Sequence, residues 1–282
     1  MLRSVLRPKT GKACLIPANA LAILLAVTTL SACQPNTTAA ETNIAIDRLW
    51  NPDASTIIFR ADITGGSLPE LARMSETAPC TVYGDGRVLW VNELDAFNTE
   101  VLFDIVPEAR IQQFIDYVAF DENFYAQDAR ATEPPEGAIA PVIETITMDI
   151  GGRRHSADNY GGWDRGFYDR IVAACKSISN TPIRFEPTEA WLTVREVAMV
   201  SDAPYVYWNP DEHEGLSLAT LADHATQPQW VSGQTVTELW RMLHSLPYTT
   251  LYGEGERSFQ IGMQVPGITR DSPARPETTT GS

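Results

Sequence analysis

The chain has 282 residues, of which 44% are hydrophobic, and a formal net charge of −15 at neutral pH. This length and apolar content suffice for a globular core, which excludes a wholly disordered chain. The negative charge argues against nucleic acid and against an anionic membrane surface as partners, because both are bound by basic patches.

The N-terminus contains the most specific motif of the chain. A basic stretch over residues 3–12 is followed by an apolar run over residues 20–30. Such a run has the length of a signal-peptide core and is short for a membrane span. The run leads directly into the sequence Leu30-Ser31-Ala32-Cys33.

This sequence resembles the lipobox of bacterial lipoprotein precursors. The resemblance implies that residues 1–32 are a signal peptide, cut before Cys33, and that Cys33 carries a diacylglycerol and usually an N-acyl chain such as palmitate. Two or more acyl chains give stable membrane anchoring. Gln34 replaces the aspartate of an inner-membrane retention signal, so we expect the periplasmic side of the outer membrane in a Gram-negative cell.

Two alternatives to a lipoprotein signal peptide also predict that the body of the protein is exported. The first 33 residues are then an uncleaved anchor helix or an ordinary signal peptide cut elsewhere, and in both the positive charges precede the apolar run. After removal of residues 1–32, 17 lysines and arginines face 36 aspartates and glutamates, a formal charge of −19.

Two of the four cysteines remain available for pairing. Cys14 leaves with the signal peptide and Cys33 is lipidated, so Cys80 and Cys175 are left. In an oxidising compartment we expect these two to form a disulfide. The alternative is two separately buried thiols.

Composition divides the exported chain into four parts. Residues 33–53 are polar and small, as in a lipidated tether, and residues 269–282 read as a disordered tail. Between them we expect an α+β domain over residues 54–182. Residues 183–268 form either a second small α+β domain or an extension of the first sheet.

The first domain repeats one order of elements. A strand at 56–63 precedes a hairpin that turns at Gly84-Asp85-Gly86, and a helix with apolar residues at helical spacing begins at Pro107. A second hairpin turns at Gly151-Gly152 and is again followed by a helix, with Trp163, Phe167, Ile171, Cys175 and Ile178 on one face. We therefore expect an α+β fold class, with antiparallel sheets built from strand–strand–helix units and helices packed on one face.

The second part contains a strand at 191–197, a helix and a closing hairpin at 249–252 and 257–263. The sequence Thr235-Val236-Thr237-Glu238 predicts a capping box at the start of the helix. His244, near the end of this helix, fits a favourable position for positive charge.

The sequence offers no motif for metal or nucleophilic chemistry. The four histidines (His155, His213, His224 and His244) lie outside any H-E-x-x-H, there is no C-x-x-C, and no G-x-S-x-G or S-x-x-K occurs. The acidic run at 211–214 lacks the spacing of a calcium loop and is typical of a solvated turn. We expect no metal, no cofactor and no enzymatic activity.

Aromatic residues are the most suggestive candidates for binding. Tyr205, Tyr207 and Trp208 stand together, and such residues are enriched at protein interfaces and also stack on sugar rings. Trp163, Trp191 and Trp240 are expected in the core.

The body resembles uncharacterised secreted bacterial proteins, a resemblance that implies no activity. The leading hypothesis is a non-catalytic lipoprotein of the bacterial envelope that binds another envelope protein. The alternative is a lipoprotein that binds glycan or peptidoglycan. The third is a hydrolase in which His155 or His213 meets carboxylates in a cleft.

Overall fold

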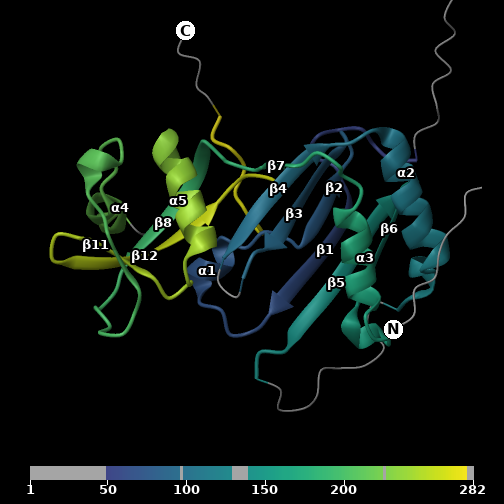
Figure 1. Cartoon of the computed structure of the whole chain (residues 1–282), viewed down its shortest axis with the longest axis horizontal. Helices are drawn as coiled ribbons and strands as arrows, with labels where there is room; N and C mark the ends of the chain where they lie inside the picture. Colours follow the sequence, from purple (N-terminus) through teal and green to yellow (C-terminus); the bar gives the residue numbers. More distant parts are fainter. Residues whose placement is uncertain (1–48, 96–97, 129–138, 225–226, 278–282) are drawn as a thin grey trace, which may run out of the picture. The chain divides into compact units, whose positions relative to one another are not determined.

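The computed structural model describes residues 49–95, 98–128, 139–224 and 227–277 (Figure 1). The predicted signal peptide, Cys33 and most of the tether lie outside the described residues. Two sheets and five α-helices make up the described part, which confirms the α+β class.

Seven antiparallel strands form the first sheet. Their order is β6-β5-β1-β2-β3-β4-β7. The strands are β1 (Ile57–Gly65), β2 (Cys80–Tyr83), β3 (Arg87–Glu93), β4 (Thr99–Ile105), β5 (Val142–Ile150), β6 (Arg153–Asp158) and β7 (Ile183–Arg184).

The two predicted hairpins of this sheet are confirmed. β2 pairs with β3 around Gly86, whose φ of +95° strongly favours glycine, and β5 pairs with β6 around Gly151 and Gly152. The repeated strand–strand–helix order is not found, because the unpredicted strand β4 lies between the first hairpin and its helix. β4 adds a further antiparallel neighbour to β3.

Helices α2 (Glu108–Asp116) and α3 (Phe167–Lys176) cover one face of this sheet. Ile111 and Phe114 of α2 and Ile171 of α3 are buried against strand residues such as Phe59 and Met148. α2 continues into a π-helical turn (Tyr117–Asp121), and short 3₁₀ turns follow at Phe124–Ala126 and Asn159–Gly161.

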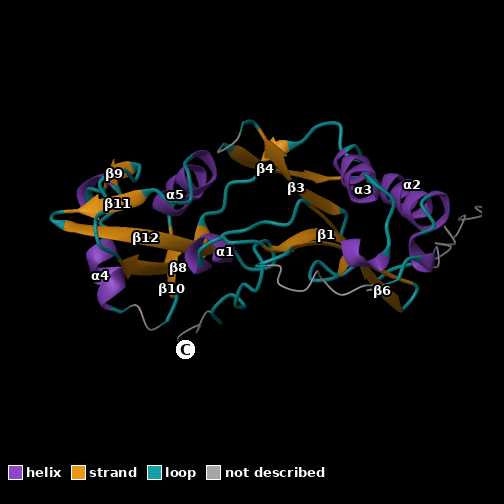
Figure 2. Ribbon diagram, turned by 90° about the horizontal axis from the view of Figure 1, so that it is seen from below, coloured by secondary structure: helices purple, strands orange, loops and turns teal. Residues whose placement is uncertain are grey.

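The second sheet has five strands in the order β10-β8-β12-β11-β9, with β9 at its margin (Figure 2). All neighbours are antiparallel except β9 and β11. The elements are β8 (Glu189–Glu196), β9 (Tyr205–Tyr207), β10 (Gln229–Ser232), β11 (Leu251–Glu254), β12 (Arg257–Gln264), α1 (Glu70–Met74), α4 (Leu218–Asp223), α5 (Gln234–Ser245) and a 3₁₀ turn at Pro210–Glu212.

The predicted capping box of α5 is wrong. The helix begins at Gln234 after Gly233, and no side chain at its N-cap makes a hydrogen bond. Instead, the backbone N–H and the hydroxyl of Thr235 donate to Glu214, at 3.0 and 3.1 Å. A carboxylate distant in sequence thus satisfies donors that the local motif was expected to satisfy.

The two sheets share a hydrophobic cluster. Tyr83, Leu89 and Val101, on the face of the first sheet away from α2 and α3, pack with residues such as Trp240 and Phe259. The second part of the chain therefore covers the β2–β3–β4 region of the first sheet. The division into separate domains at residue 182 stays a prediction.

Part of the expected disordered tail makes defined contacts. Thr269 is buried, and the Arg270 guanidinium binds Asp62 at 2.5 Å and Glu76 at 2.7 Å. Nearby, the Tyr83 hydroxyl donates to the carbonyl of Gly267 at 2.6 Å. These contacts hold residues 267–270 against the first sheet, although the segment has little apolar content to signal order.

Candidate functional site

Cys80 and Cys175 form the expected disulfide. Their Cα atoms are 6.4 Å apart, and both side chains are fully buried in the first core. The bond joins β2 to α3 across 95 positions of sequence. Cys33, the expected lipid attachment, lies outside the described residues.

The three candidate aromatics divide into two exposed residues and one buried residue. The side chains of Tyr205 and Tyr207 are 45% and 67% exposed, whereas Trp208 is fully buried. Trp208 stacks on His213 at 3.7 Å and donates its indole N–H to the carbonyl of Leu216. Trp208 therefore belongs to the core, and the expectation that it contacts a partner is corrected.

Strand β9 presents unpaired backbone groups at the edge of the second sheet. In its parallel pairing with β11, the carbonyl of Pro204 accepts from Leu251 and the N–H of Trp208 donates to Gly253. Backbone direction alternates along a strand, so the N–H and C=O groups of Tyr205 and Tyr207 point away from β11. Among the described residues no further strand lies on that side.

The side chains of Tyr205 and Tyr207 also follow this alternation and lie on one face of the strand. Val206 and Trp208 pack into the core, so the two tyrosines lie on the opposite face of the strand. Tyr205 lies across Gly253 so closely that a Cβ on that glycine would fall 1.5 Å from the tyrosine oxygen. The tyrosine ring therefore occupies space above β11 that any side chain larger than that of glycine at position 253 would fill.

Exposed apolar and acidic side chains stand close to β9 in the sequence. Met199 and Val200, in the segment leading to β9, are 64% and 60% exposed. Asp202 and Asp211 flank the strand, are exposed, and have no ion-pair partner in the described part of the chain. Edge strands are usually protected by charge or covered by other elements, whereas this one combines free backbone with exposed apolar side chains.

A second feature is a polar groove on the first sheet, where β1, β5 and β6 are not covered by the second part of the chain. Its volume is about 730 Å³, within the range of ligand cavities. Apart from Ile57, the lining is hydroxyl-bearing and charged: Ser55, Thr56, Arg60, Asp62, Thr64, Thr145, Thr147, Asp149, Arg154, Arg270 and Asp271. No aromatic side chain lines it.

Much of the charge in this groove is already paired. Arg270 binds Asp62 and Glu76, and the Nε atom of Arg60 lies 3.6 Å from Asp62. Burial raises the pKa of Glu76, although the charge of Arg270 opposes that shift. The paired groups hold the C-terminal segment in place, so the open part of the groove is a polar surface without a dominant charge.

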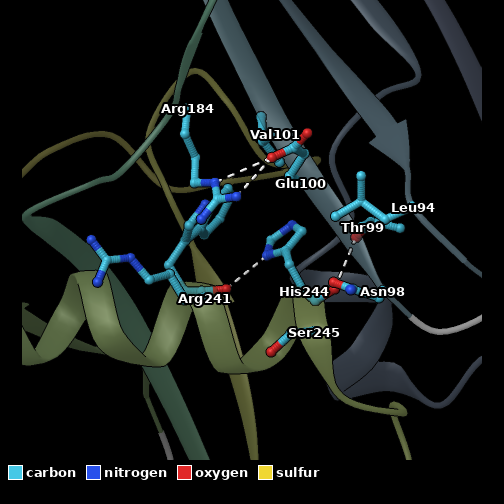
Figure 3. Close-up of a pocket in the computed structure, with 10 residues that line it drawn as sticks. Leu94, Asn98, Thr99, Glu100, Val101, Arg184, Arg241, His244 and Ser245 are labelled. Carbon is cyan, nitrogen blue, oxygen red and sulfur yellow. Dashed lines mark hydrogen bonds and ion pairs between the residues drawn. The ribbon is translucent and has the colours of Figure 1, made fainter.

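A third feature is the hollow of about 220 Å³ between β4 and α5 (Figure 3). Glu100 accepts hydrogen bonds from Asn92 and Arg184, and Thr99 donates to the carbonyl of His244. The hollow is smaller than most ligand cavities, and its arginines are occupied, since Arg241 pairs with Glu186. We therefore interpret it as a junction between the two sheets.

His244 lines this hollow, and its surroundings disfavour the positive charge that its place near the helix end led us to expect. Burial lowers the pKa of its imidazole, although a hydrogen bond to the Trp240 carbonyl opposes the shift. Because a carbonyl only accepts, Nδ1 carries the proton. The side chain turns back onto Trp240, with ring centroids 4.1 Å apart, instead of extending towards solvent.

Two other histidines have structural partners. His155 contacts the carbonyl of Gln127, and His213 contacts the Glu238 carboxylate at 3.1 Å. Within the described ranges no group of three histidine, cysteine or acidic side chains is arranged to hold a metal ion. No helix in the same ranges is long and apolar enough to cross a membrane.

Comparison with known proteins gives no match. No family model, curated protein or solved structure is significantly similar to the chain. In its geometry, the β9 edge combines more features of a recognition surface than the groove or the hollow. The alternation Tyr-Val-Tyr-Trp at 205–208 fits outward tyrosines and a buried tryptophan, but it has this meaning only once β9 is known to be a strand.

Proposed function

We propose that this protein is an exported, lipid-anchored binding protein of the bacterial envelope, attached through Cys33, which recognises another protein at the edge of strand β9. The observation that carries the proposal is the pair of exposed tyrosines, Tyr205 and Tyr207, on a strand whose outer backbone groups are unpaired. The proposal includes no catalytic step.

Strand addition explains why these features occur together. An extended segment of a partner forms backbone hydrogen bonds with an open sheet edge, and its alternate side chains provide specificity. Tyrosines supply large contact areas at low entropic cost and are enriched among residues that dominate binding energy. Met199 and Val200, in the segment before β9, are exposed apolar residues that a partner could also contact.

The proposed anchor fits such a role. The tether proposed from the composition of residues 33–53 would separate the body from the membrane surface. Replacing Cys33 by serine should abolish acyl labelling and block processing of the precursor. Unchanged labelling would contradict the anchor and leave partner binding to be judged separately.

Chemical crosslinking in intact cells tests the binding site. The lipidated protein is purified after crosslinking, and its adducts are identified by mass spectrometry. We expect one dominant protein adduct that is lost in the double variant Tyr205→Ala, Tyr207→Ala. The matched control is Tyr248→Ala, which removes another exposed tyrosine outside β9. Equal adducts in both variants would exclude the β9 edge.

The polar groove favours a second candidate function, the binding of glycan or peptidoglycan. Threonine hydroxyls, Asp149 and Arg154 offer hydrogen bonds to a hydroxyl-rich ligand, and the volume is sufficient. The groove lacks the aromatic platform on which sugar rings stack, which places this candidate second. Binding of soluble peptidoglycan fragments that is lost in Asp149→Ala but kept in Tyr207→Ala would establish it.

A further inference from the structure

The charge around β9 restricts the kind of segment that can bind there. Residues 196–240 contain seven carboxylates and neither lysine nor arginine. Arg257, in the adjoining β11–β12 hairpin, is already paired with Glu196 at 2.7 Å and Asp223 at 2.9 Å. Residues 196–240 therefore carry a net negative charge.

Not every carboxylate of this region contributes to recognition. Glu214 accepts hydrogen bonds at the start of α5, and Glu238 contacts His213. Asp202 and Asp211 differ, because both are exposed and neither forms an ion pair among the described residues. They stand three residues before and four residues after β9, so each lies within roughly 15 Å of the strand, at about 3.3 Å per residue.

From these observations we infer that the partner segment is a cationic strand, with lysine or arginine at alternate positions and apolar residues between them. The inference rests on the proposed function, since it names the chemistry of the segment that β9 binds. The basic side chains lie on the face of Tyr205 and Tyr207, between Asp202 and Asp211. The apolar residues lie on the face of Val206.

Two physical effects favour this arrangement. Opposite charges across an interface select the partner and speed association, whereas like charges directly opposite each other in a sheet are unfavourable. A lysine or arginine over an exposed tyrosine ring gains a cation–π attraction. The exported chain, with a charge of −19, is itself a poor occupant, because pairing two copies at β9 would bring their carboxylates together.

Binding of short peptides to the purified full chain tests the inference. The probes are a peptide of alternating lysine and valine, its glutamate–valine counterpart, and a lysine–valine peptide interrupted by proline. We expect the basic peptide to bind at least about tenfold more tightly than the acidic one at low salt, and the preference to shrink as salt is added. The proline peptide should bind weakly, because it lacks a backbone donor.

Variants of the chain test which residues cause the preference for the basic peptide. Asp202→Asn with Asp211→Asn should reduce the preference for the basic peptide several-fold. The control, Asp121→Asn with Asp169→Asn, removes two exposed carboxylates of the helical region and should leave it unchanged. Tyr207→Pro removes an outward backbone N–H without affecting a hydrogen bond to β11, so it should weaken binding more than Tyr207→Ala, which keeps that donor. A thermal unfolding curve for each variant verifies that it is folded.

The outcomes separate the two proposals. If both charged peptides bind equally and both are weakened by Tyr207→Pro, strand addition stands and the cationic partner is wrong. If no peptide responds to Tyr207→Pro and the crosslinked adduct also persists in the tyrosine variants, the proposed function fails. A dimer of the chain that dissociates on Tyr207→Pro would overturn the cationic partner in favour of a second copy.

Discussion

The protonation of His244 is decided by its surroundings. Its imidazole is buried beside Trp240, and desolvation lowers its pKa below the ordinary value of the unfolded chain. At a pH between the folded and the unfolded pKa, the unfolded chain therefore binds more protons than the folded chain. The free energy of unfolding is therefore unaffected by this group at a pH above the unfolded pKa of about 6.5. It decreases as the pH falls from that value through the lower folded pKa.

We predict that the free energy of unfolding in urea decreases between pH 7.5 and pH 5.5, and that this decrease is smaller in His244→Phe. The exposed His224 supplies the control, since His224→Gln should keep the pH dependence of the original chain. An identical pH dependence in His244→Phe would show that other groups cause it.

Gly253 determines the position of Tyr205. A Cβ at Gly253 would meet the tyrosine oxygen at 1.5 Å, so Gly253→Ala should displace the ring. Because the ring is 45% exposed, we predict a change of about 1 kcal/mol or less in the free energy of unfolding. The yield of the crosslinked protein adduct should decrease, as we also expect for Tyr205→Ala alone. The two substitutions combined should do no more than either alone, and additive losses would separate Gly253 from Tyr205.

At the residue scale the sequence predicted some roles and missed others. Tyr205 and Tyr207 were identified because aromatics beside polar residues are typical of recognition surfaces, but Trp208 was grouped with them because burial is a tertiary property. His244 was expected to be charged because its place in the helix was known, whereas its burial against β4 was not. Thr235 was expected to form a local cap, but Glu214 acts from 21 positions away.

Helix α4 depends on a carboxylate from another element. Glu254 of β11 accepts from the backbone N–H groups of Leu218 and Ala219, at 2.6 and 3.1 Å, and from the hydroxyl of Ser217. A short helix gains from such a partner, because its first N–H groups have none within the helix. We predict that Glu254→Ala lowers the free energy of unfolding by about 0.5–2 kcal/mol. The exposed Glu256→Ala is the control, and an equal loss there would contradict the capping role.

The disulfide fixes α3 to the first sheet. Replacing Cys80 and Cys175 together by alanine should lower the free energy of unfolding by about 2–4 kcal/mol, chiefly by freeing the unfolded chain. Unfolding in urea, with and without a thiol reductant, measures this. The reductant should destabilise the original chain and leave the double variant unaffected. A stability that does not respond to reductant would show that the bond contributes little.

Elements with strong local signals were predicted, and those formed by pairing were not. The hairpins at Gly86 and at Gly151 follow from turn chemistry, and α2 follows from its helical spacing. β4 was missed although Asp95 and Asn98, residue types typical of turns, precede it, and its place in the sheet comes from pairing with β3. β9 has only three residues, too few for a pattern to distinguish it from a loop.

At the scale of the whole molecule, two sheets share a core, and the surface proposed for recognition lies at the edge of the second one. The α+β class followed from the order of the elements, but the strand order in each sheet did not. Strand order depends on contacts between distant segments, such as β1 with β5. The open edge of β9 could therefore be recognised only once its neighbours were known.

Photo-crosslinking in intact cells is the most direct test of the central claim, that β9 binds an extended segment of another protein. A photoreactive residue is placed at position 207 and, as a control, at position 120, where Phe120 is 77% exposed in the first part of the chain. We predict one protein adduct from position 207, with a crosslinked peptide whose sequence is rich in lysine or arginine. We predict no such adduct from position 120. Adducts that are absent at position 207, or that are the same at both positions, would contradict the claim.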